Sequence, residues 1–214
     1  NRNKDSQILD ILDKMLVHDK EVVVNTAKYI IEKNVPIHVM GEDLTYDNPH
    51  VYTSEITGQR LITTMESVET FEACTEGFRI YLSKERFYQN PDFKTGKEAH
   101  REATDDDPSI ERTEELGLIN CLVHETNHII NKKNVIGQDN PTPESRANFY
   151  RGLTSEQLAI TTAMDEYHAY TAAQGNLYGM SDKDIRSTIE NLYTKNRQLP
   201  DGVYQVIWNV DNSF

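Results

Sequence analysis

The sequence has no long apolar run. No stretch approaches eighteen uninterrupted apolar residues, so it predicts no membrane-spanning helix. Hydrophobic residues make up 37% of the 214 positions and charged residues 27%, proportions typical of a globular chain with a well-solvated surface. A chain of this length suits one continuous hydrophobic core better than two very small ones.

Basic residues are few compared with acidic ones. Lysine and arginine number 22 against 35 aspartates and glutamates, which gives a formal net charge of -13. A surface this acidic repels phosphate backbones, which argues against nucleic-acid binding as the main function. The same charge favours basic substrates or partners.

Cysteine is scarce as well, with only Cys74 and Cys121 in the chain. Two cysteines are too few for a disulfide scaffold or an all-cysteine metal site. They can form a single disulfide or remain as two buried thiols, and we expect the thiols.

Hydrophobic periodicity predicts helices, then strands, then helices again. This order indicates an α+β fold rather than alternating βαβ units. We expect one domain over 1–214, with a helical segment at 1–35, a strand-rich part at 36–108 and a helical part at 109–214. The expected helices lie at about 8–16, 21–33, 110–133, 154–174 and from 181; the expected strands at 36–40, 51–57, 61–65, 78–83 and 203–208; and the expected loops at 88–108 and 134–152.

The segment His124-Glu125-Thr126-Asn127-His128 has the pattern H-E-x-x-H within the expected long helix. Residues four apart share a helix face, so both imidazoles can reach one metal ion. Glu125 lies about 100° round the helix, where it can bind a metal-activated water without ligating the ion. The pattern is typical of zinc-dependent hydrolysis with Glu125 as general base. The alternative is a core helix whose histidines are hydrogen-bonded inside the protein.

A catalytic zinc ion needs a third protein ligand and one open position. The best candidate is Glu166 in the next helix. It is the one charged member of a stripe of small residues, formed by Ala159, Thr162, Ala163, Glu166, Ala169, Tyr170 and Ala173. An acid on such a packing face is costly to bury unless it meets a cation. Asp165 and His168 point away from the stripe, as outer-sphere or surface groups. The alternative is an ordinary packing face on which Glu166 pairs with a lysine or arginine.

His124-Glu125-x-x-His128 followed by Glu166-x-x-Ala169 resembles the zincin metallopeptidases, specifically the gluzincin branch. The resemblance implies a zincin-like fold, in which a small, twisted, mostly antiparallel sheet packs on the active-site helix and further helices follow. It also implies a Zn²⁺-dependent peptidase, most often an endopeptidase, that takes peptide or protein substrates. Asn131 and Asn134 stand where metzincins have glycine and histidine, which excludes that class.

Gluzincins commonly offer a tyrosine or histidine to the developing negative charge of the transition state. Tyr170 is the first choice here because it shares the stripe with Glu166, and Tyr167 and His168 are the alternatives. In outline the chain is also similar to bacterial secreted or injected toxin proteases, which favours a secreted or delivered bacterial protein over a cytoplasmic one. Two other functions remain open: a zinc-binding zincin-fold protein that acts as a binding or regulatory module, and a metal-free interaction module.

Overall fold

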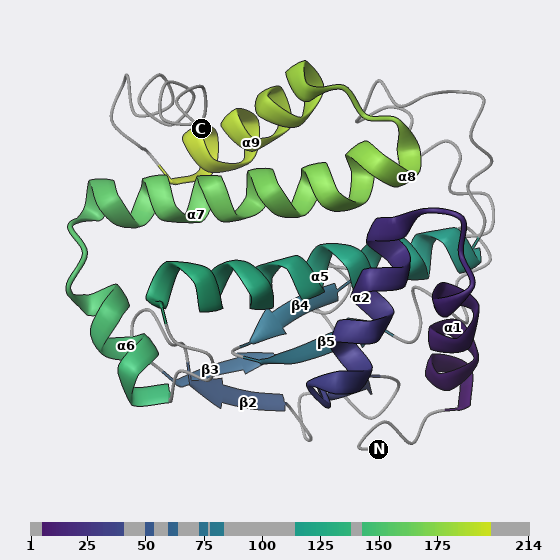
Figure 1. Ribbon diagram of the computed structural model, residues 1–214. Coiled ribbons are helices and arrows are strands. Elements are labelled where there is room, and N and C mark those ends of the chain that lie inside the picture. The colour runs from purple at the N-terminus through teal and green to yellow at the C-terminus, as the bar shows by residue number, and fades with distance from the viewer. Residues whose placement is uncertain are drawn as a thin grey trace.

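The computed structural model describes residues 6–40, 50–53, 60–63, 73–76, 78–83, 114–137 and 143–197. These residues combine helices with small sheets, which confirms the α+β class (Figure 1). The helical elements are α1 (Ser6–Leu16), α2 (Glu21–Glu32), α5 (Glu114–Ile136), α6 (Pro143–Arg151), α7 (Ser155–Tyr170), the π-helical turn η2 (Thr171–Gly175), α8 (Asn176–Tyr178) and α9 (Asp182–Arg197). None of the helices in this part of the chain is both long and apolar enough to cross a membrane.

The strands form a three-stranded sheet and a separate hairpin. In the larger sheet the order is β1 (Ile37–Met40), β5 (Arg79–Ser83), β4 (Ala73–Glu76). The β1–β5 pair is parallel and the β4–β5 pair is antiparallel. The predicted hairpin is confirmed, because β2 (His50–Thr53) pairs with β3 (Arg60–Thr63) in antiparallel register.

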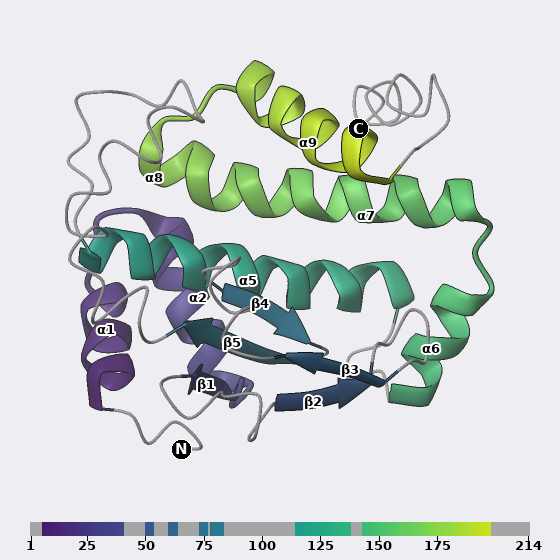
Figure 2. The same cartoon turned by 180° about the vertical axis from the view of Figure 1, so that it is seen from behind.

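Helix α5 lies between the sheet and α7 (Figures 1 and 2). One side of α5 packs on β4 and β5, and α7 runs antiparallel along another side. The main core joins α1, α2, the sheet and α5, with Ile8, Met15, Val23, Ile80, Leu82 and Leu122 fully buried. A second cluster holds α7 against α9 through Ala159, Ala163, Met180, Ile185 and Ile189. Helix α5, which carries the H-E-x-x-H motif, is therefore covered on several sides, which fixes its position.

The N-terminus of α7 follows the local sequence closely. The Thr154 hydroxyl accepts a hydrogen bond from the Gln157 backbone N–H at 3.2 Å, and the Gln157 side chain accepts one from the Thr154 N–H at 2.9 Å. This reciprocal pair is a capping box, which satisfies two backbone donors that the first helical turn leaves free. The predicted start of this helix is confirmed.

One sequence-based expectation about secondary structure is wrong. The loop expected at 134–152 contains the end of α5 and all of α6. Pro143 does not end a helix but occupies the first position of α6, where its missing N–H has no helical partner to lose. The strand expected at 78–83 is confirmed as β5, and Tyr81 on it is buried together with Ile80 and Leu82. Both faces of β5 are therefore covered at these positions, and Tyr81 stacks on His38 of the neighbouring strand β1.

Other expectations fall partly or wholly outside the described residues. These are the loop at 88–108, the terminal strand at 203–208 and the first residues of the turn that begins at 57. Cys121 is buried in α5 as a thiol and forms no disulfide. The expectation of a thiol rather than a disulfide is therefore confirmed for Cys121.

Candidate metal centre

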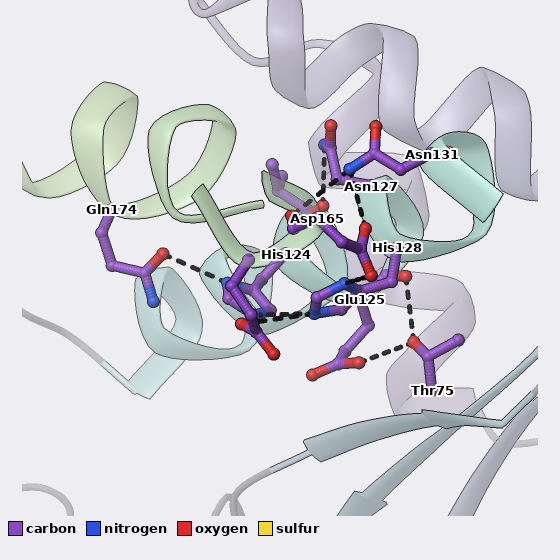
Figure 3. A network of polar contacts seen from close by, with 10 residues as sticks. Thr75, His124, Glu125, Asn127, His128, Asn131, Asp165 and Gln174 are labelled. Carbon is purple, nitrogen blue, oxygen red and sulfur yellow. Dashed lines mark hydrogen bonds and ion pairs between the residues drawn. The ribbon is translucent and has the colours of Figure 1, made fainter. Parts of the chain in front are cut away.

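The side chains of His124 and His128 converge from successive turns of α5, with their Nε2 atoms facing each other. The Nε2 atoms of His124 and His128 are 3.1 Å apart, and the two rings meet edge-on (Figure 3). Both side chains are largely buried, with 14% and 10% of their surface exposed. The four-residue spacing thus brings the imidazoles together as the sequence predicts.

Glu166 joins this pair from α7. Its Oε2 atom lies 3.5 Å from His124 Nε2 and 3.7 Å from His128 Nε2. A triangle with sides of 3.1, 3.5 and 3.7 Å has a circumscribed circle with a radius of about 2.0 Å. A single ion can therefore lie about 2.0–2.1 Å from all three atoms, the length of zinc bonds to histidine nitrogen and carboxylate oxygen. The three donors fit a zinc ion in type and in spacing.

Glu125 lies next to this triangle but is held differently. It is buried, with 6% of its surface exposed, and it forms with His124 and His128 a group whose potential ligand atoms lie within 4.8 Å of one another. Its Oε2 atom accepts a hydrogen bond from the Thr75 hydroxyl at 2.6 Å. Among the described residues, the carboxylate that forms ion-pair contacts with both imidazoles is that of Glu166. Both carboxylates thus lie near the imidazole pair: Glu166 makes ion-pair contacts with both rings, and Glu125 is held by Thr75.

Thr75 reaches Glu125 from the sheet. Its hydroxyl lies 2.6 Å from the Glu125 carboxylate and 3.0 Å from the Glu125 backbone carbonyl oxygen, and it has one hydrogen to share between them (Figure 3). Strand β4 packs on α5, which brings Thr75 to this position. This contact has no signal in the sequence, because a lone threonine fifty positions before Glu125 has no diagnostic spacing.

Each histidine also has a hydrogen-bond partner on its second ring nitrogen. His128 Nδ1 lies 2.8 Å from Asp165 Oδ2, and the Asn131 amide donates to Asp165 Oδ1 at 2.9 Å. His124 Nδ1 lies 3.3 Å from Gln174 Oε1. Such partners hold metal-binding histidines in the tautomer that turns the other nitrogen towards the ion. Sequence reasoning placed Asp165 among the outer-sphere or surface groups and did not find Asn131 or Gln174 in this role.

The electrostatic surroundings of His128 are strongly negative. Burial lowers the pKa of this imidazole, but the hydrogen bond and charge of Asp165 and the charges of Glu166 and Glu125 outweigh burial. They raise the pKa from 6.5 to about 9. The site therefore attracts positive charge, a proton in the metal-free chain and a cation when one is present.

The aromatic candidates on α7 lie in different surroundings. Tyr170 meets the His124 ring edge-on, with 5.0 Å between ring centroids. Tyr167 donates its hydroxyl to Asp182 Oδ1 at 2.5 Å and lies beneath the Arg186 guanidinium, so it faces α9. His168 is exposed beside Tyr167. The structure brings Tyr170 to the histidine pair and engages Tyr167 elsewhere.

No protein-family model, no curated protein and no solved structure matches this chain. The chemistry of the site is therefore inferred from its side chains and distances.

Proposed function

We propose that this chain is a zinc-dependent peptidase in which His124, His128 and Glu166 hold the ion and Glu125 is the general base. The observation that carries the proposal is the triangle formed by His124 Nε2, His128 Nε2 and Glu166 Oε2. One point inside this triangle is about 2.0 Å from each of the three atoms, which is the length of a zinc–ligand bond. Two imidazoles and one carboxylate make up a catalytic zinc site that keeps a position open for water or substrate. The resemblance to gluzincins supports the same ligand set.

When bound, zinc supplies a Lewis acid that activates water and polarises a substrate carbonyl. The residues of the chain supply the remaining functions. Glu125 takes the proton of the attacking water, and Thr75 keeps one of its carboxylate oxygens fixed. Glu125 then delivers the proton to the leaving amine, so the carboxylate returns to its starting state. Tyr170, beside His124, is the proposed donor to the developing oxyanion.

The proposed substrates are peptides or proteins, with basic ones favoured. The net charge of -13 attracts cationic chains over long range. Around the site itself, the carboxylates of Glu125, Asp165 and Glu166 add local negative charge, of which a bound zinc ion neutralises only part. A zincin-like fold and endopeptidase action are parts of the same proposal.

The ligand assignment is tested by zinc content. Elemental analysis of the purified protein is expected to find about one zinc per chain. Glu166→Gln removes a ligand, so we expect it to weaken zinc binding by more than the about 10–100-fold that loss of an outer hydrogen-bond partner causes. Asp165→Asn is the matched control, because it makes the same carboxylate-to-amide change one residue away and removes only such a partner. If Asp165→Asn abolishes zinc binding and Glu166→Gln preserves it, the assignment is wrong.

A further inference from the structure

Gln174 approaches the metal centre from the π turn η2, and we propose that it is a positioning residue that fixes the tautomer and orientation of His124. This inference rests on the proposed zinc site and adds a device that holds one of its ligands. The contact that carries it is between Gln174 Oε1 and His124 Nδ1, which are 3.3 Å apart (Figure 3).

The π turn explains how Gln174 reaches His124. A π turn contains one residue more than an α turn, so residues along it fall progressively behind their places in a continuous α-helix, by about 100° at its end. A continuous helix would put Gln174 about 80° away from Glu166 around the axis. The extra residue turns Gln174 back towards the side of α7 that carries Glu166. Both side chains then meet His124.

The π turn is held by its own side-chain contacts. The Asn176 amide nitrogen donates to the carbonyl oxygens of Thr171 at 2.9 Å and Ala172 at 3.1 Å. These contacts tie the Asn176 side chain back to the first residues of the turn. π turns are rare and occur often at functional sites. The π turn η2 follows the helix that carries the candidate ligand Glu166, and this position supports a function for the turn.

The direction of the hydrogen bond determines whether His124 can bind a metal. With Gln174 Oε1 as acceptor, the imidazole carries its hydrogen on Nδ1, and the lone pair of Nε2 points at Glu166 and His128. The opposite tautomer would place a hydrogen on Nε2 and block coordination. Gln174 is also neutral, whereas the partner of His128 is the Asp165 carboxylate.

Zinc affinity measured by competition with a chromophoric chelator tests this role without relying on hydrolysis. Gln174→Leu keeps the approximate size of the side chain but removes the acceptor, and we expect about 10–100-fold weaker zinc binding. Gln174→Glu restores an acceptor and adds negative charge, so it is expected to bind zinc at least as tightly as the wild type. Gln157→Leu is the matched control. It makes the same change at the exposed start of α7, where it removes half of the capping box and should leave zinc affinity unchanged.

Nitrogen NMR shifts of the imidazoles provide a second measurement. In the zinc-loaded wild type we expect His124 to carry its hydrogen on Nδ1. Gln174→Leu binding zinc as tightly as the wild type would overturn the role of Gln174 and leave the zinc site standing. A zinc-loaded wild-type His124 with its hydrogen on Nε2 would overturn both the role of Gln174 and the assignment of His124 Nε2 as a ligand. A wild-type protein that binds no zinc would overturn the proposed function itself. If Gln174→Leu does not fold, Gln174→Glu takes its place in the test. Zinc affinity equal to that of the wild type upholds the inference. Loss of zinc binding in folded Gln174→Glu contradicts it.

Discussion

At His128, burial and negative charge act on one imidazole in opposite directions. Burial favours the neutral ring, while Asp165, Glu166 and Glu125 favour the protonated one, and the acids prevail with a pKa of about 9. The folded metal-free chain thus holds a proton more tightly than the unfolded chain, in which the pKa is near 6.5. This proton stabilises the metal-free fold fully below pH 6.5 and ceases to do so as the pH rises through 9.

The proton on His128 leads to a prediction about the pH dependence of zinc binding. Zinc needs the neutral imidazole, so binding displaces the proton, and zinc affinity is expected to rise with pH up to about 9 and then level off. Calorimetry at pH 7.5 in buffers of different ionisation enthalpy should show release of about one proton from His128 per zinc bound. Asp165→Asn removes the leading cause of the raised pKa and should reduce that release. Proton release that is the same in both proteins would contradict the assignment to His128.

Thr75 is the second residue with a measurable effect. Thr75→Val removes the hydroxyl that holds Glu125, while zinc ligation is expected to remain intact because no ligand changes. A hydrogen bond to a charged group is worth about 1.5–3 kcal/mol, so we expect kcat/KM for peptide hydrolysis to fall about tenfold or more. Thr75→Ser keeps the hydroxyl and should retain most of the activity. Wild-type rates in zinc-loaded Thr75→Val would show that the contact does not serve the general base.

The residues that the sequence could predict are those whose geometry is local. His124 and His128 are one helical turn apart, so their shared face follows from spacing alone. Glu166 could be found because its small-residue stripe marks a close helix contact. Gln174 and Thr75 depend on a π turn and on the packing of β4, which no local pattern encodes.

At the scale of elements, α7 is the segment whose placement matters most, because it carries Glu166 and leads into η2. Its capping box was visible in the sequence as Thr154 and Gln157, since the motif requires only one fixed spacing. The π turn was not visible, because the apolar pattern from 159 to 173 also fits a continuous helix. Similarly, Pro143 could be interpreted as a breaker or a helix start, and only the structure distinguishes these alternatives.

The element-scale prediction concerns the same cap. Thr154→Ala removes the hydroxyl that accepts from the Gln157 N–H, and such a loss costs about 1 kcal/mol of unfolding free energy. For a chain of this size we expect a fall in Tm of about 2–4 °C. Thr161→Ala, in the interior of α7, is the matched control and should be neutral or slightly stabilising, because alanine is the better helix former. Equal Tm values for the two variants would show that the cap does not stabilise the helix.

At the scale of the whole molecule, the sequence predicted the class of fold but not its topology. Helices around a strand cluster were predictable from periodicity, and the hairpin of β2 and β3 from its short connection. The parallel pairing of β1 with β5 joins segments about forty positions apart, and nothing in either strand specifies that partner. Composition acts at this scale too, because the net charge of -13 belongs to the entire surface and, in the proposed function, favours basic substrates.

The most direct test of the central claim is hydrolysis by zinc-loaded wild type and Glu125→Gln proteins. The substrate is a mixed peptide library that includes basic peptides, and chelator-treated wild type serves as the metal-free control. Glu125 is not among the proposed ligands His124, His128 and Glu166, so Glu125→Gln should keep its zinc and its fold. An amide cannot accept the proton of the attacking water, so cleavage is expected to fall by about 10² to 10⁴. Zinc-loaded wild type that cleaves nothing above the Glu125→Gln background would contradict peptidase function and favour a non-catalytic zinc-binding protein.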